Sequence, residues 1–156
     1  MTVPEIASAG STAAASAGTA VSVTRFRLRT LLFAPSFFLH AHRTIVQIRK
    51  ADGFVAGAVL RDAHFAFWTL TLWRDDAAMR TYATSGAHRR AMPRLAEWAD
   101  EASVAHWRQA GARLPDWTEA ARRLRAEGRP LPLRHPAPSH ANHGFAAPAT
   151  TRGMRI

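Results

Sequence analysis

The stretch FWTLTLWRDDAAMRTYATSGAHRRAM, residues 67–92, decides the fold, because it holds a strand, a helix start and a helix break in succession. From Phe67 to Trp73 the residues alternate between two sets, the period of two that is typical of a β-strand. Asp75 or Asp76 then caps a helix. Ser85-Gly86 interrupts that helix, which resumes through His88.

Toward the N-terminus the pattern predicts three further elements. RFRLRTLLF, residues 25–33, places its arginines on one side and its apolar residues on the other, as in a first strand. Pro35 can start a helix, which Asp52-Gly53 ends. FVAGAVLRD, residues 54–62, is then a strand that pairs with residues 64–73 as an antiparallel hairpin.

Toward the C-terminus the broken helix kinks near Pro93, and ASVAHWRQA, residues 102–110, follows as a fourth strand. The spacing of Asp116 and Glu119 is that of a capping box, which opens a last helix. The fold class is therefore α+β, with a ferredoxin-like βαββαβ order and an added C-terminal helix.

Composition divides the chain into one domain and two tails. Residues 1–23 and 135–156 are rich in small residues and proline, so we expect both to be disordered and residues 24–134 to fold. The chain has no cysteine, no apolar stretch of about 20 residues that could cross a bilayer, and no recognisable signal peptide. We therefore expect a cytoplasmic protein with no membrane partner.

The net charge of +10 allows a nucleic-acid partner, but the basic residues are almost all arginine in an alanine-rich chain. That pairing is typical of codon bias in a GC-rich genome, so nucleic-acid binding is the last of our hypotheses. Neither face of the strand that ends at Trp73 is a good solvent face, because Phe67, Thr69, Thr71 and Trp73 alternate with Trp68, Leu70 and Leu72. A second copy, packed sheet against sheet, would cover the face that the helices leave bare, which predicts a homodimer.

The run of residues 67–92, with EWADEASVAHW and LPDWTEAARRL after it, resembles the dimeric α/β-barrel superfamily. Within it the chain is similar to an uncharacterised group near spheroidene monooxygenase and the antibiotic-biosynthesis monooxygenases. Trp73 matches the tryptophan that ends the third strand, and Ser85 and His88 match a Ser-x-x-His step. The resemblance implies a monooxygenase-like protein, with haem as a possible cofactor. In haem-degrading relatives the iron-binding histidine lies about where Met92 falls here.

The candidate catalytic residues are His88 and His106. His88 could ligate haem iron, shuttle a proton, or satisfy the backbone that the Ser85-Gly86 break frees. His106 shares a strand face with Val104 and Arg108, and could meet His88 across the fold. No spacing of His, Asp and Glu indicates a metal site.

The candidate ligand-binding residues are Trp73, Arg29, Phe67 and Trp68. The aromatic side chains could line a pocket for a flat apolar molecule, although they could equally form core and dimer interface. Arg29, with Arg25 and Arg27, could face the interior and meet haem propionates or a substrate carboxylate, or lie on a solvated edge. The sequence thus predicts a monooxygenase-like protein that binds a small, flat, apolar molecule; the alternative is a non-catalytic ligand-binding or structural homodimer.

Overall fold

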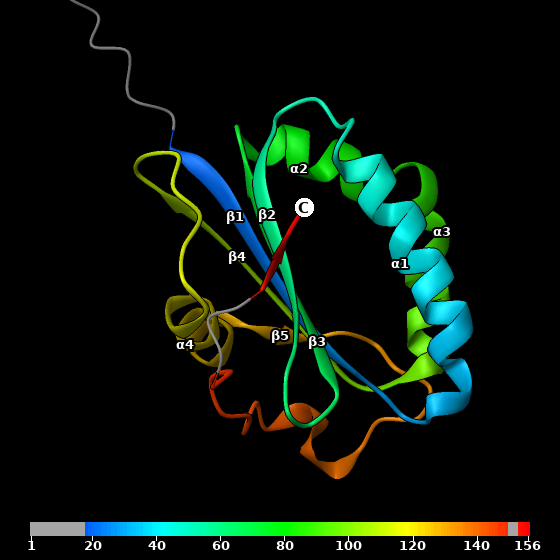
Figure 1. Cartoon of the computed structure of the whole chain (residues 1–156). Helices are drawn as coiled ribbons and strands as arrows, with labels where there is room; N and C mark the ends of the chain where they lie inside the picture. Colours follow the sequence, from blue (N-terminus) through cyan, green and yellow to red (C-terminus); the bar gives the residue numbers. More distant parts are fainter. Residues whose placement is uncertain (1–17, 150–152) are drawn as a thin grey trace, which may run out of the picture.

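The helices of the described residues pack on one antiparallel sheet, as Figure 1 shows. The computed structural model describes residues 18–149 and 153–156. The elements are β1 Thr19–Leu28, η1 Leu31–Phe33, α1 Ala34–Ile48, β2 Phe54–Arg61, β3 Ala66–Trp73, α2 Asp76–Ala83, α3 Gly86–Trp98, β4 Ala99–Gln109, α4 Trp117–Glu127, β5 Arg129–Pro130, η2 Pro138–Ala141 and β6 Met154–Arg155. The strand order is β5-β4-β1-β3-β2-β6. Its four long strands run in the order β4-β1-β3-β2, which confirms the predicted ferredoxin-like class.

The sheet has two differently covered faces. On the helix face, Phe26 of β1 packs edge-on against Phe37 of α1, with ring centroids 5.0 Å apart. On the outer face, Val21 and Val23 of the same strand form a core cluster with Leu124 of α4. Figure 1 accordingly shows α1, α2 and α3 on one side of the sheet and α4 on the other.

Side-chain caps fix where the helices begin. The Asp75 carboxylate accepts the backbone N–H of Ala78 at 2.8 Å, and Asp116 accepts that of Glu119 at the same distance. Both caps were predicted, and each satisfies an N–H group that has no partner within its helix. The predicted break is also present: Gly86 begins α3 with φ +55°, a value that favours glycine.

The predicted first strand is present, but it runs from Thr19 to Leu28 and not over 25–33, so the ordered chain begins before the expected domain start at residue 24. Ala20, Val21 and Val23 are completely buried between β3 and β4, and this burial offsets the entropy of ordering five further residues. The remainder of the predicted N-terminal tail, residues 1–17, lies outside the described residues. Thr30 instead begins a 3₁₀ turn, where its hydroxyl accepts the N–H of Leu32.

Residues 135–149 and 153–156 are ordered and pack on the folded domain, whereas the sequence led us to expect a disordered tail; residues 150–152 of that predicted tail lie outside the described residues. Phe145 packs against Trp68 with ring centroids 5.4 Å apart, and Met154–Arg155 adds strand β6 to the edge of β2. The Ser139 hydroxyl donates to the Glu101 carboxylate. A small number of well-placed contacts therefore holds a segment whose average composition is typical of a tail.

The same segment and α4 cover the apolar face that was expected to pair with a second copy. Trp68, Leu70 and Leu72 of β3 are at most 1 % exposed within the single chain. One side of α4 supplies the cover, with Trp117, Ala120, Ala121 and Leu124 buried against the sheet. The face that was expected to pair with a second copy is therefore already covered within the single chain. Within the described residues, no helix combines the length and apolarity needed to span a membrane.

Candidate functional site

The helix face is sealed at both ends by apolar clusters. At one end Ile48 of α1 packs with Ala20, Trp73, Ala78 and Met79. At the other end Phe26 and Trp98 form a cluster against which Phe37 and Phe67 pack. The middle of the helix face lies between these two clusters.

Small and polar side chains occupy that middle, and the strand register aligns them. Ser22 of β1 lies between Thr71 of β3 and His106 of β4, and Thr24 lies beside Thr69 one step along. Neighbouring side chains on one face of a sheet are about 5 Å apart, so these five form one group. We call Ser22, Thr24, Thr69, Thr71 and His106 the polar patch.

The helix residues that face the polar patch are small and only partly buried. Ala41 of α1 lies at helical spacing between Phe37 and Ile48, and Ala91 of α3 lies at the same spacing from Leu95 and Trp98. Both alanines are only half-buried, as are Ser22, Thr24 and Thr69 on the central strands. Solvent therefore reaches the middle of the helix face, although both ends are closed.

His88 lies at the start of α3, where it satisfies the backbone at the helix break. Its Nδ1 is 2.9 Å from the Ala83 carbonyl oxygen, which fixes Nδ1 as the protonated nitrogen of a neutral ring. Burial lowers the pKa of His88, and the hydrogen bond to Ala83 opposes this effect. The bond is the one expected if His88 has a structural role; a catalytic role stays a prediction.

Three rings connect His88 to the polar patch. The His88 ring lies 4.9 Å from that of Tyr82, and the Tyr82 ring lies 5.1 Å from that of Trp73. The Trp73 indole N–H then donates to the Thr71 hydroxyl at 2.9 Å. Trp73 thus lies at the border of the polar patch, and its indole ring system is buried in the apolar cluster that contains Ile48.

His106 belongs to the polar patch itself, and its predicted strand face with Val104 and Arg108 is confirmed. Its side chain keeps contact with solvent. Desolvation and the charge of Arg129 lower the pKa of His106, while Asp76 acts in the opposite direction. The imidazole is therefore neutral near pH 7 and can accept a proton. Among the described residues no hydrogen bond joins it to His88, so the structure does not bring the two histidines into contact.

Phe67, the third aromatic candidate, lies on the helix face at the opposite end from Trp73. Its ring stacks on Phe26 and contacts Phe37, with centroids 5.6 and 4.7 Å apart. It is half-buried, so part of the ring borders the open middle of the face.

Two of the predicted ligand-binding residues lie elsewhere. Trp68 points to the outer face, because neighbouring residues on a strand point to opposite faces; its indole N–H donates to Asp62 at 2.9 Å. Arg29 follows the end of β1 and pairs with Glu97 at 2.9 Å, on the exposed side of the molecule. Neither side chain contributes to the polar patch.

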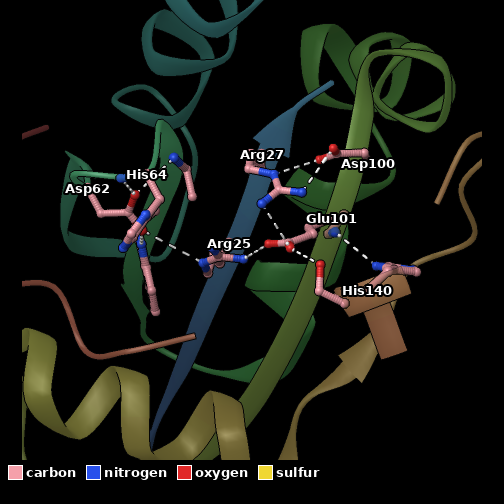
Figure 2. A network of polar contacts seen from close by, with 11 residues as sticks. Arg25, Arg27, Asp62, His64, Asp100, Glu101 and His140 are labelled. Carbon is pink, nitrogen blue, oxygen red and sulfur yellow. Dashed lines mark hydrogen bonds and ion pairs between the residues drawn. The ribbon is translucent and has the colours of Figure 1, made fainter. Parts of the chain in front are cut away.

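A buried ionic network on the outer face was not foreseen, and Figure 2 shows it. Arg25 is 5 % exposed and donates to Glu101 at 2.7 Å, while Arg27 pairs with Asp100 at 2.9 Å. Asp62 approaches Nε of Arg25 to 3.8 Å. The arginines therefore meet carboxylates of their own chain, and the idea that they await haem propionates or a substrate is wrong. The alternation of the arginines in the sequence indicated that they share one face of the strand. The strand pairing that brings the carboxylates to that face could not be predicted from the sequence.

The polar patch does not suit haem. A porphyrin needs broad apolar contact on both of its faces, whereas Ser22, Thr24 and Thr69 present hydroxyl groups at the centre of this site. The Nδ1 atom of His88 is already hydrogen-bonded, so only its Nε2 atom could ligate an iron ion. The imidazole ring is also packed against Tyr82. Among the described residues no group of three or more His, Asp or Glu side chains could hold a metal ion.

Comparisons with known proteins place this arrangement among related folds. A conserved protein from Methanosarcina mazei is similar with a TM-score of 0.54 and 18 % identity, over 60 % of this chain and 95 % of that chain. The N63A variant of SnoaB from Streptomyces nogalater, a cofactor-independent oxygenase, is similar with a TM-score of 0.52 and 20 % sequence identity. The match covers 64 % of this chain and 100 % of that chain. An antibiotic biosynthesis monooxygenase-like protein from Nitrosomonas europaea is similar with a TM-score of 0.54 and 12 % sequence identity. The match covers 61 % of this chain and 96 % of that chain.

These likenesses show the fold alone, and they confirm the predicted resemblance to the dimeric α/β-barrel superfamily. No curated protein matches the sequence. A family model matches residues 39–153, which is well over half of the chain. The chain therefore belongs to the family described as the domain of unknown function DUF3291.

Proposed function

We propose that this protein is monooxygenase-like and binds a small, flat aromatic molecule with a polar substituent over the polar patch. The observation that carries the proposal is the open, hydroxyl-lined middle of the helix face between two aromatic clusters. Phe67 and Trp73 border it from opposite ends and can contact the flat rings of a ligand. Ser22 and Thr71 can hydrogen-bond its polar group.

His106 is the group in the patch that can move a proton. Its lowered pKa keeps the imidazole unprotonated near neutral pH, so the ring is available to accept the proton of a phenolic hydroxyl. Deprotonation makes an aromatic ring electron-rich and easier for oxygen to oxidise. A cofactor-independent oxygenase has a similar fold, and we propose that here too no cofactor is needed because the substrate itself supplies the electrons.

Binding tests the first half of the proposal. Quenching of tryptophan fluorescence by 2-naphthol should saturate, and 2-methoxynaphthalene, which cannot donate a hydrogen bond, should bind more weakly. Ala91→Leu fills the space over the patch and should weaken 2-naphthol binding by on the order of tenfold. Ala126→Leu, on the exposed side of α4, is the matched control. Equal affinities for both ligands, or no effect of Ala91→Leu, would contradict the proposal.

Oxygen uptake tests the second half. With 1,4-dihydroxynaphthalene the protein should consume oxygen faster than the buffer alone, and His106→Gln should lower this rate roughly 100-fold without abolishing binding. Binding without any accelerated uptake would favour the alternative of a non-catalytic ligand-binding protein.

We also propose that the chain forms a homodimer in the cytoplasm, through a surface other than the sealed outer face. Leu31, Leu32 and Phe38, at the start of α1, are 65 %, 86 % and 54 % exposed. Exposed apolar groups of this size favour association. Sedimentation should show twice 17.1 kDa, and Leu32→Arg should shift it to the monomer. Val55→Arg, at the start of β2, is the control; a wild-type monomer would overturn the proposal.

A further inference from the structure

A second cavity lies on the outer face of the sheet, away from the polar patch. Its volume is about 500 Å³, within the range of small-molecule sites. It is enclosed by β2 and β3, by the loop that precedes α4, and by the C-terminal strand β6.

The floor of this cavity is apolar and well fixed. Ala58 and Leu70 are cross-strand neighbours of β2 and β3, and Trp117 of α4 packs in the same core cluster. All three are buried, so they form a rigid support and expose little of their own surface to the cavity. Leu114 and Pro115 form a wall beside Trp117.

The rim carries two arginines from distant parts of the sequence. Arg113 belongs to the loop before α4, which a 2.6 Å hydrogen bond from Gln109 to the Arg113 carbonyl oxygen holds in place. Arg155 belongs to β6, where it lies opposite Ala58. Neither guanidinium forms an ion pair with a carboxylate of the described residues. Asp116 also lines the cavity and keeps its negative charge while it accepts the Glu119 N–H, so the two arginines exceed it by one positive charge.

We propose that this cavity binds a small organic anion with a flat apolar body, such as an aromatic carboxylate. The rings of the ligand would lie against Leu114 and Pro115, which are half-buried, and its carboxylate would be held by Arg113 and Arg155. Guanidinium groups suit this task, because their planar arrangement of donors matches a carboxylate in two parallel hydrogen bonds. This site is separate from the proposed oxygenase site, since the two lie on opposite faces of the sheet.

Calorimetric titration of the full chain with 2-naphthoate, and with the neutral 2-naphthamide as matched ligand, tests the proposal. We expect saturable binding of 2-naphthoate and at least about tenfold weaker binding of 2-naphthamide. The double variant Arg113→Gln/Arg155→Gln should lose about tenfold or more of the affinity for 2-naphthoate. Both side chains are exposed, so the variant should fold, and an unchanged melting temperature checks this.

Two controls separate this site from the others. Arg49→Gln removes an exposed arginine at the end of α1 and should leave 2-naphthoate binding unchanged. Ala91→Leu, which fills the space over the polar patch, should also leave it unchanged. Equal affinity for 2-naphthoate and 2-naphthamide, or a double variant that binds like the wild type, would overturn the proposal. Loss of binding in Ala91→Leu alone would assign the ligand to the helix face and overturn it as well.

Discussion

The Gln47 side chain caps α3 from the neighbouring helix, since its Oε1 accepts the backbone N–H of His88 at 2.9 Å. Its Nε2 donates to the Ser85 carbonyl oxygen at 3.1 Å. Ser85 is the residue at the N-cap, yet its own side chain makes no capping bond. Gln47 of α1 thus provides the capping hydrogen bond that the N-cap serine usually provides. The same side chain links α1 to α3 at the helix break.

Replacement of Gln47 by alanine should lower the free energy of unfolding by about 1–2 kcal/mol, because it leaves the His88 N–H without its partner. Gln47→Glu keeps the acceptor and loses the donor, so it should cost less. Urea denaturation at pH 7.5 measures both. Equal stability of wild type and Gln47→Ala would show that water replaces the cap at no cost.

His88→Ala should cost about 1–3 kcal/mol, because it leaves the Ala83 carbonyl oxygen without its donor. If His88 instead serves only a ligand, the variant should keep its stability and lose 2-naphthol binding. A thermal melt and a fluorescence titration on the same variant distinguish the two roles. Retention of both stability and binding would contradict both.

The stability that His88 contributes should also depend on pH. Because burial lowers its pKa in the folded state below the ordinary value of 6.5, the unfolded chain takes up a proton first as the pH falls. The contribution is therefore complete above pH 6.5 and is lost as the pH falls below it. Urea denaturation at pH 7.5 and 5.5 should show a larger loss for the wild type than for His88→Ala; equal losses would contradict the assignment.

Periodicity and local caps allowed much of the fold to be predicted. The helix that begins near Pro35, the hairpin that ends at Trp73 and the cap at Asp116 depend on residues close in sequence, and all three are present. His106 was placed on the correct strand face for the same reason. Alternation along a strand assigns two faces, but it does not identify which face the helices cover, and this is why Trp68 was placed in the site.

The parts that could not be predicted depend on contacts between distant segments. Ser22 and Thr71 become neighbours of His106 only through strand register, which the sequence does not specify. Arg25 finds Glu101 in the same way, 76 residues further along the chain. Phe145 lies in a segment with the composition of a tail, and no local pattern indicated that its ring would pack against Trp68.

Glu101→Gln tests the ionic network. It removes a buried charge that pairs with Arg25, and breaking such a pair should cost about 2–4 kcal/mol. Glu97→Gln, whose partner Arg29 is more exposed, is the matched control and should cost less than about 1 kcal/mol. Similar costs for both variants would show that the network contributes no more than a surface pair.

The network should also weaken in acid. Burial on its own would raise the pKa of Glu101, but hydrogen bonds from Ser139 and Arg25, and the charges of Arg25 and Arg27, lower it overall below 4.5. The resulting stability is present above pH 4.5 and is lost as the pH falls through the lowered value, because the unfolded chain then binds the proton more readily. Wild type should therefore lose more stability than Glu101→Gln between pH 6 and 3.5 in urea titrations.

Removal of residues 135–156 should strongly destabilise the protein, contrary to what their composition suggests. The truncation uncovers Trp68 and Arg25, over which Phe145 lies, and it removes the hydroxyl that Ser139 donates to Glu101. A single substitution, Phe145→Ala, keeps the rest of the segment in place and measures the contribution of this ring. Its half-buried ring contributes packing on Trp68 and a cation–π contact with Arg25 at 4.6 Å, so the variant should lose about 2–3 kcal/mol. His135→Ala, an exposed position in the same segment, should change the free energy of unfolding by less than about 0.5 kcal/mol. If Phe145→Ala were as stable as His135→Ala, the C-terminal segment would be an accessory cover and not a part of the core.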